Sequence, residues 1–96
     1  MRLSLGDRIR PSAQVLSREV GDEIVLMSLA TDAYFGLDGT GKRVWQLLID
    51  GHSVGDTIES IATEYTVKRE QVEHDVLALL ADLVAAGLIE VDAAEG

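Results

Sequence analysis

Apolar residues cluster in three short runs in the first half of the chain. Residues 14–20 and 23–29 are rich in valine, isoleucine and leucine, and Gly21 and Asp22 between them form a typical two-residue hairpin turn. The third run, residues 33–37, follows another pair of turn residues. Short apolar runs joined by tight turns predict an antiparallel meander of three strands.

After the third run, apolar residues recur at the spacing of helices. A first helix is predicted over about residues 39–50, with Asp38 in a position to cap it. A second is predicted from Ser53, a residue type that commonly caps helices. The third and longest covers about residues 68–86, and Gly87 stands where a left-handed residue often ends a helix. Residues 88–91 are apolar and can form a last short strand.

Three strands followed by three helices indicate an α+β domain, with the helices packed on one side of a three-stranded antiparallel sheet. The order from Ser53 onward, helix, turn, helix and strand, is that of a winged helix-turn-helix. We expect an N-terminal arm over residues 1–13, one domain over 14–91 and an acidic tail over 92–96.

The composition excludes several kinds of site. A chain of 96 residues suits one small domain. It contains no cysteine, so disulfides, thiolate metal sites and cysteine nucleophiles are excluded. The formal net charge is −9, and from Ser53 onward only two basic residues face ten acids. Because nucleic-acid affinity depends on Lys and Arg, we expect no nucleic-acid partner. The lack of a long apolar stretch predicts no membrane partner, and the absence of cysteine fits a reducing cytoplasm.

No motif in the sequence supports catalysis, nucleotide binding or metal binding. Residues 36–42 match the phosphate-loop pattern G-x-x-x-x-G-K, but Arg43 replaces the Ser or Thr that coordinates magnesium. His52 and His74 lack the spacing of metal ligands. There is no G-x-S-x-G nucleophile motif. We therefore predict a protein that is not an enzyme and has no catalytic residue, cofactor or metal.

The predicted third helix carries more apolar residues than one buried face requires. One stripe contains Val72, Val76, Leu79, Leu80 and Leu83, and a second contains Leu77, Ala81 and Val84. The second stripe either packs under the sheet or first helix, or leaves part of a wide apolar face open as a groove wall. The third strand has no charge or proline from Ala33 to Gly36 to protect its edge. An exposed edge beside an apolar helix favours binding of a peptide as an added strand.

These residues also carry a resemblance to a known family. The chain resembles the PqqD family, and most of all its lasso-peptide branch, the small stand-alone B1 proteins. The likeness covers about residues 14–89 and rests on order and spacing. It is carried by Tyr34, Phe35, Gly36, Leu37, Asp38, Gly41, Val44, Trp45, Gln46, Leu47, Leu48, Gly51, Val72, Asp75, Val76, Leu79, Leu80, Leu83, Gly87, Leu88 and Ile89.

The resemblance implies a RiPP recognition element, a winged-helix-like domain that binds the leader segment of a ribosomally made precursor peptide. In that family the leader adds to the third strand, in a cleft walled by the third helix. The peptide-binding residues carried over are Asp32, Ala33, Tyr34, Phe35 and Gly36 on the strand and Val72, Asp75, Val76 and Leu79 on the helix. Asp75 is then a partner for a basic or hydrogen-bonding leader residue, while Trp45 and Leu48 belong to the core. The family pattern gives no role to the arm or the acidic tail.

The function that follows is a non-catalytic adaptor, or peptide chaperone, for lasso-peptide biosynthesis. It would bind the precursor leader and present it to a B2-type leader peptidase and a macrolactam cyclase. One alternative is a PqqD-like carrier for another peptide-modifying enzyme, such as a radical enzyme. The other is a winged-helix DNA-binding regulator, against which the acids that open the third helix argue.

Overall fold

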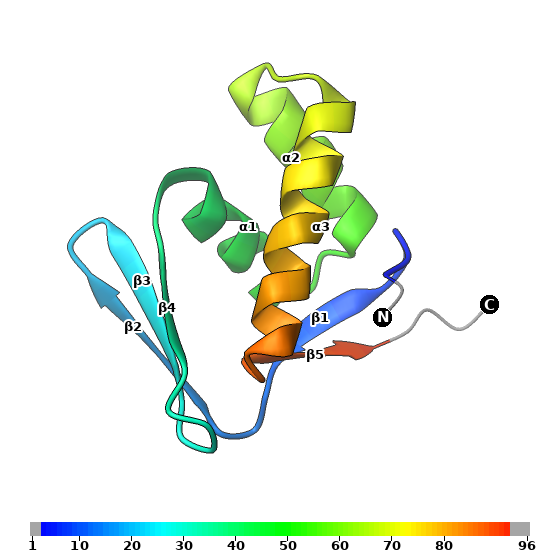
Figure 1. Ribbon diagram of the computed structural model, residues 1–96. Coiled ribbons are helices and arrows are strands. Elements are labelled where there is room, and N and C mark those ends of the chain that lie inside the picture. The colour runs from blue at the N-terminus through cyan, green and yellow to red at the C-terminus, as the bar shows by residue number, and fades with distance from the viewer. Residues whose placement is uncertain (1–2, 93–96) are drawn as a thin grey trace.

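The predicted hairpin turn joins strands β2 (Val15–Val20) and β3 (Glu23–Ser28) in the computed structural model, which describes residues 3–92 (Figure 1). Gly21 adopts the left-handed φ of +62° that such two-residue turns require. Strand β4 (Tyr34–Leu37) pairs antiparallel with β3, giving a sheet in the order β2-β3-β4. The predicted three-stranded meander is confirmed.

The register of this sheet determines which backbone groups remain free. The N–H of Ser28 donates to the carbonyl of Ala33 at 2.8 Å, and the N–H of Asp32 donates to the carbonyl of Ser28 at 3.0 Å. In an antiparallel pair, residues whose backbone faces the partner alternate with residues whose backbone faces away. Since Met27 pairs with Tyr34 and Val25 with Gly36, the backbone N–H and C=O of Tyr34 and Gly36 point to the open edge.

The same alternation applies to the other edge. The N–H of Leu29 donates to the carbonyl of Gln14 at 2.8 Å, which makes this a hydrogen-bonded pair. Ser17 and Glu19 are therefore residues of β2 whose backbone groups face away from β3. Both outer strands present unpaired backbone groups along an edge.

The three helices are α1 (Gly39–Ile49), α2 (Val54–Tyr65) and α3 (Arg69–Ala85), close to the predicted bounds. Helix α1 packs against β3, α2 and α3, so it lies at the centre of the fold. The α+β, winged helix-turn-helix-like class is confirmed. Within residues 3–92, no helix is long and apolar enough to cross a membrane.

The helix ends follow the sequence signals with one exception. The side chain of Ser53 accepts a hydrogen bond from the N–H of Asp56 at 3.1 Å, as a cap should. Gly87 has a left-handed φ of +75° after α3. Asp38 occupies the cap position of α1, but its side chain makes no capping bond, so that prediction was wrong.

The core joins the inner face of β3 to the facing sides of all three helices. Trp45 and Leu48 are buried in it, as expected. Its most completely buried side chains are those of Leu26, Val44, Leu48, Val54, Ile58, Ile61, Leu80, Leu83 and Leu88. Burial of these side chains provides the main stabilisation of a chain that has no cysteine to form a disulfide.

The segment expected to be an arm is part of the fold. Strand β1 (Arg8–Pro11) pairs antiparallel with β5 (Ile89–Asp92) as a second, two-stranded sheet. The carbonyls of Leu5 and Asp7 accept hydrogen bonds from the first N–H groups of α2, at 2.7 and 2.9 Å. The side-chain pattern carries no signal for these backbone contacts, which is why the sequence alone suggests an arm. The predicted acidic tail lies outside the described residues, except for Asp92.

We expect Ile9→Ala to lower the free energy of unfolding by about 2–4 kcal/mol, because the side chain is 4% exposed and its removal leaves a cavity. Urea unfolding measures the change. The control is Arg10→Ala, which removes only exposed ion pairs to Glu90 and Asp92 and should cost less than about 1 kcal/mol. Equal losses in the two variants would contradict a structural role for β1.

Candidate functional site

The open edge of β4 is the first part of the candidate site. Tyr34 and Gly36 direct their backbone N–H and C=O groups away from β3, as the register requires. The side chain of Tyr34 is 71% exposed. Gly36 has no side chain. A Cβ at this position would lie 2.5 Å from Oε1 of Glu23, so the side chain of Glu23 would have to move to admit a larger residue. The edge can accept another strand without displacing any part of the described chain.

The other predicted strand residues hold this edge in place. Ala33 uses its carbonyl to bond Ser28, and Phe35 is half-buried with its ring against the core. Asp32 has a left-handed φ of +59° in the loop that precedes the strand. These three residues support the edge, while Tyr34 and Gly36 present the free backbone groups.

A cleft between α1 and α3 is the second part. Two adjoining pockets, of about 180 and 100 Å³, share the lining residues Thr40, Asp75 and Val76. Leu79 lines the larger pocket and Val72 the smaller. The structure therefore brings together all four residues that the sequence predicted on the third helix.

The cleft has apolar walls and one carboxylate at its mouth. Val72 and Val76 are buried and Leu79 is half-buried, whereas Asp75 is exposed. The side-chain amide of Gln71, one turn earlier, donates to the Asp75 carboxylate at 3.0 Å and holds it along the helix. The cleft can take two small apolar side chains together with a hydrogen-bond donor or cation.

The strand edge and the cleft are separate surfaces that meet at one junction. None of the residues 32–36 lines either pocket. Strand β4 runs through Leu37 directly into α1, whose first turn supplies Thr40 and Gly41 to the cleft. A strand added along β4 would therefore lead towards the cleft.

Several lining residues were absent from the sequence prediction. Thr40, Gly41 and Val44 come from α1, and Ile61, Tyr65 and Val67 from α2 and the turn after it. For Gly41 the sequence offers one weak indication of a special role, because glycine is an unusual residue inside a helix. A Cβ there would lie 3.6 Å from a methyl group of Leu37 and 4.0 Å from one of Leu79, so a larger side chain would extend into the cleft.

The second apolar stripe of α3 belongs mainly to the core. Leu77 and Val84 are half-buried and pack against the core cluster, while Ala81 is exposed. The wall of the cleft is instead formed by the first stripe, through Val76 and Leu79. Of the two interpretations of the second stripe, packing is the correct one for Leu77 and Val84.

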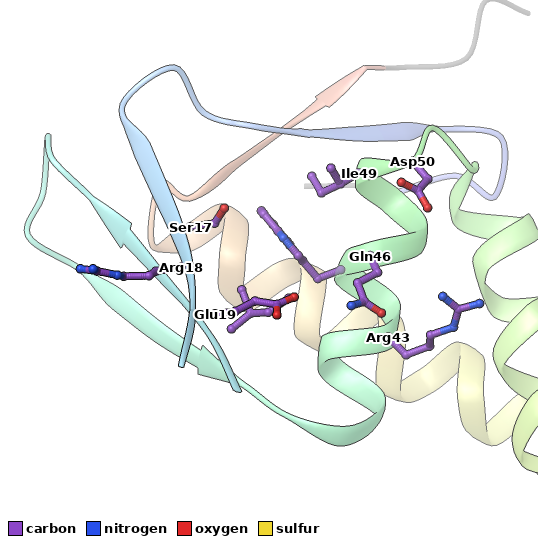
Figure 2. A pocket seen from close by; sticks show the side chains of 9 residues that line it. Ser17, Arg18, Glu19, Arg43, Gln46, Ile49 and Asp50 are labelled. Carbon is purple, nitrogen blue, oxygen red and sulfur yellow. The ribbon is translucent and has the colours of Figure 1, made fainter. Parts of the chain in front are cut away.

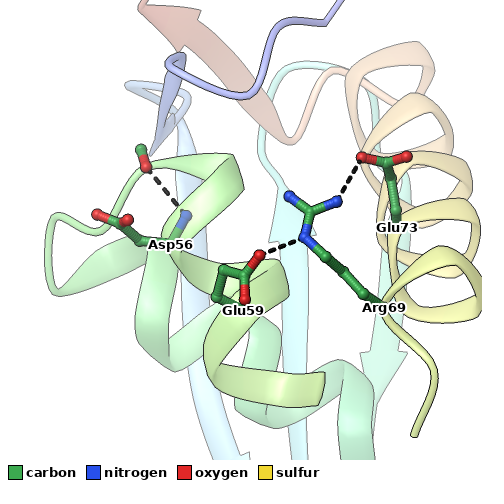
Figure 3. A network of polar contacts seen from close by, with 5 residues as sticks. Asp56, Glu59, Arg69 and Glu73 are labelled. Carbon is green, nitrogen blue, oxygen red and sulfur yellow. Dashed lines mark hydrogen bonds and ion pairs between the residues drawn. The ribbon is translucent and has the colours of Figure 1, made fainter. Parts of the chain in front are cut away.

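The start of α3 is held by a network of charges (Figure 3). Arg69 pairs with Glu59 of α2 and, at 3.3 Å, with Glu73 one turn along its own helix. The hydrogen bond to Glu59 raises the pKa of Arg69 above its usual value. This cation is therefore engaged by carboxylates at the point where a DNA-reading helix would approach phosphates.

Metal-binding and nucleotide-binding arrangements are not found in the described part of the chain. Within residues 3–92 no three His, Asp or Glu side chains gather as a metal site would require. His52 and His74 are both exposed. The glycine-rich segment forms the end of β4 and the first turn of α1, where Gly39 has a φ of +50°.

Known proteins share both the sequence pattern and the fold. The PqqA binding protein of Gluconobacter oxydans (strain 621H) is 33% identical over 60 residues, 62% of each chain. That of Bradyrhizobium diazoefficiens is 34% identical over 65 residues, 68% of this chain and 63% of that protein. The matches therefore span less than two thirds of the length of these relatives.

Two solved structures are similar over nearly their whole length. TbiB1 in complex with the TbiA(beta) leader peptide is 38% identical, with a TM-score of 0.80 over 90% of this chain and 99% of that one. A lasso peptide synthetase B1 complexed with the leader peptide is 28% identical, with a TM-score of 0.80 over 86% and 98%. The model of the family described as coenzyme PQQ synthesis protein D matches residues 23–89. This chain therefore belongs to the PqqD family.

Proposed function

We propose that this protein is a non-catalytic RiPP recognition element that binds the leader segment of a lasso-peptide precursor as an extra strand on β4. The main support is the open edge at Tyr34 and Gly36, which leads into the cleft beside Asp75. Strand addition uses such an edge for affinity and neighbouring pockets for specificity. Both similar structures contain a leader peptide, which supports the same assignment.

Binding would proceed through two kinds of contact. The leader backbone pairs with the free N–H and C=O groups of Tyr34 and Gly36, which extends the sheet to a fourth strand. Apolar leader side chains enter the cleft against Val76 and Leu79, and a basic or hydrogen-bonding one meets Asp75. The backbone contacts tolerate many leader sequences, so the cleft determines which leader is preferred.

The bound precursor would be presented to a B2-type leader peptidase and a macrolactam cyclase in the cytoplasm, where ribosomes make the precursor. Holding substrate beside the enzymes raises its effective concentration without any chemistry by this chain. The alternative that the relatives favour is a carrier of PqqA-like peptides for a different modifying enzyme, since the curated relatives are named PqqA binding proteins.

Fluorescence anisotropy with two labelled probes distinguishes these assignments. We expect the TbiA(beta) leader to bind at least about tenfold more tightly than PqqA, because the chain is more similar to the protein that carries that leader. Preference for PqqA would favour the carrier, and binding of neither would contradict both. A labelled DNA duplex tests the alternative of a winged-helix DNA-binding regulator. Such a regulator would bind the duplex with an affinity that falls steeply as the salt concentration rises.

The backbone contact is tested by Tyr34→Pro, compared with Tyr34→Ala. Proline removes the N–H that points to the open edge, so we expect leader affinity to fall at least about tenfold. Alanine keeps the N–H and should change affinity by less than about threefold. Circular dichroism confirms that both variants are folded. Equal affinities in two folded variants would contradict docking on this edge.

The cleft is tested by Leu79→Ala, compared with Leu77→Ala. Both leucines lie on α3, half-buried against the core, but only Leu79 lines the cleft. We expect leader affinity to fall about tenfold for Leu79→Ala, because apolar contact with the leader is lost, and to stay within about twofold for Leu77→Ala. Comparable losses in both variants would indicate a general loss of stability rather than a contact in the cleft.

A further inference from the structure

Another cavity lies at the opposite edge of the sheet from β4. It has a volume of about 420 Å³ and separates the inner face of β2 from α1 (Figure 2). Figure 2 shows Glu19 directed from β2 towards α1, whereas Arg18 points away from the cavity. The lining residues are Ser17, Arg18, Glu19, Ile24, Arg43, Trp45, Gln46, Ile49 and Asp50.

The cavity lies below a second open strand edge. Strand β2 is the outer strand of its sheet, and the backbone N–H and C=O groups of Ser17 and Glu19 face away from β3. The side chains of the same two residues line the cavity. A strand added to β2 would therefore place alternate side chains next to it.

Trp45 contributes an apolar ring and one hydrogen-bond donor to the wall of the cavity. Its side chain is 5% exposed, and its indole N–H, which has no acceptor within residues 3–92, is open to solvent rather than buried. An acceptor brought into the cavity, such as a backbone carbonyl of an added strand, would replace solvent at this N–H.

The charges at the cavity favour a basic occupant. Glu19 and Asp50 contribute carboxylates that form no ion pair within residues 3–92, and Asp50 is near enough to Arg43 to help Glu64 raise the pKa of that guanidinium. The guanidinium of Arg43 is already held by Glu64 of α2, at 3.0 Å. Lys or Arg side chains on the inward positions of an added strand would meet these carboxylates, with their aliphatic stems over Trp45 and Ile49.

The outer face of β2 favours apolar rather than basic residues on an added strand. Leu16 and Val20 lie on that face, on either side of Arg18, and are 56% and 57% exposed. Outward side chains of an added strand would pack beside them, and apolar ones would remove them from water. The matching segment therefore alternates basic residues inward with apolar residues outward.

We propose that the β2 edge and its cavity form a second docking site, for an extended segment of a partner protein with alternating basic and apolar residues. Because β2 and β4 are opposite edges of one sheet, this partner and a peptide on β4 can bind at the same time. A second copy of this chain fits less well, because its own β2 would bring another Glu19 to the carboxylates of the cavity.

The probe is the peptide acetyl-Val-Lys-Val-Lys-Val-amide, titrated into the isotopically labelled chain and followed by NMR. Trp45 is the single tryptophan, so its indole N–H gives one resolved signal. We expect saturable shifts of that signal and of the Ser17 and Glu19 amides. The matched peptide with Glu in place of Lys should bind at least about tenfold more weakly. Glu19→Gln combined with Asp50→Asn should remove most of that difference.

Ser17→Pro and Ser17→Ala test the backbone contact. Proline removes an N–H that faces the open edge and should abolish the shifts, while alanine keeps it and should preserve them. An unchanged indole signal, or equal binding of the Lys and Glu peptides, would overturn the proposal. Shifts confined to Tyr34 and Gly36 would also overturn it, by assigning the peptide to β4. Sedimentation that detects a dimer abolished by Ser17→Pro would assign the edge to a second copy.

Discussion

The hydrogen-bond register of the three-stranded sheet is the constraint on which both proposed sites depend. The two-residue turn at Gly21 sets the pairing of β2 with β3, and the loop through Asp32 sets that of β3 with β4. A shift of one residue would turn Leu26 out of the core and point the backbone groups of Tyr34 back into the sheet. Burial of the inner face therefore also determines which N–H groups are free at each edge.

Helix α1 separates the two sites and contributes to both. Thr40, Gly41 and Val44 face the cleft beside α3, whereas Trp45 and Ile49 face the cavity beside β2. In each set, residues four apart lie on one side of the helix. Because α1 packs against β3, α2 and α3 at once, its position controls the width of the cleft and of the cavity together. A small domain can thus offer two surfaces while burying one core.

Much of the cleft was predictable because helical spacing places Val72, Asp75, Val76 and Leu79 along one side of a single element. The residues that complete it come from other elements, and no local pattern links Thr40 or Tyr65 to α3. The strand edge was predictable as a feature, but which of its residues present free backbone groups required the pairing with Ser28.

The sequence by itself determined the order of elements, the turns and most helix ends, because these depend on local preferences and on the spacing of apolar residues. Only the tertiary structure decided that residues 8–11 pair with 89–92, that Asp38 makes no cap and that Trp45 lines a cavity. Such features arise from backbone contacts between distant segments and from how closely side chains fill space. Neither leaves a periodic signal along the chain.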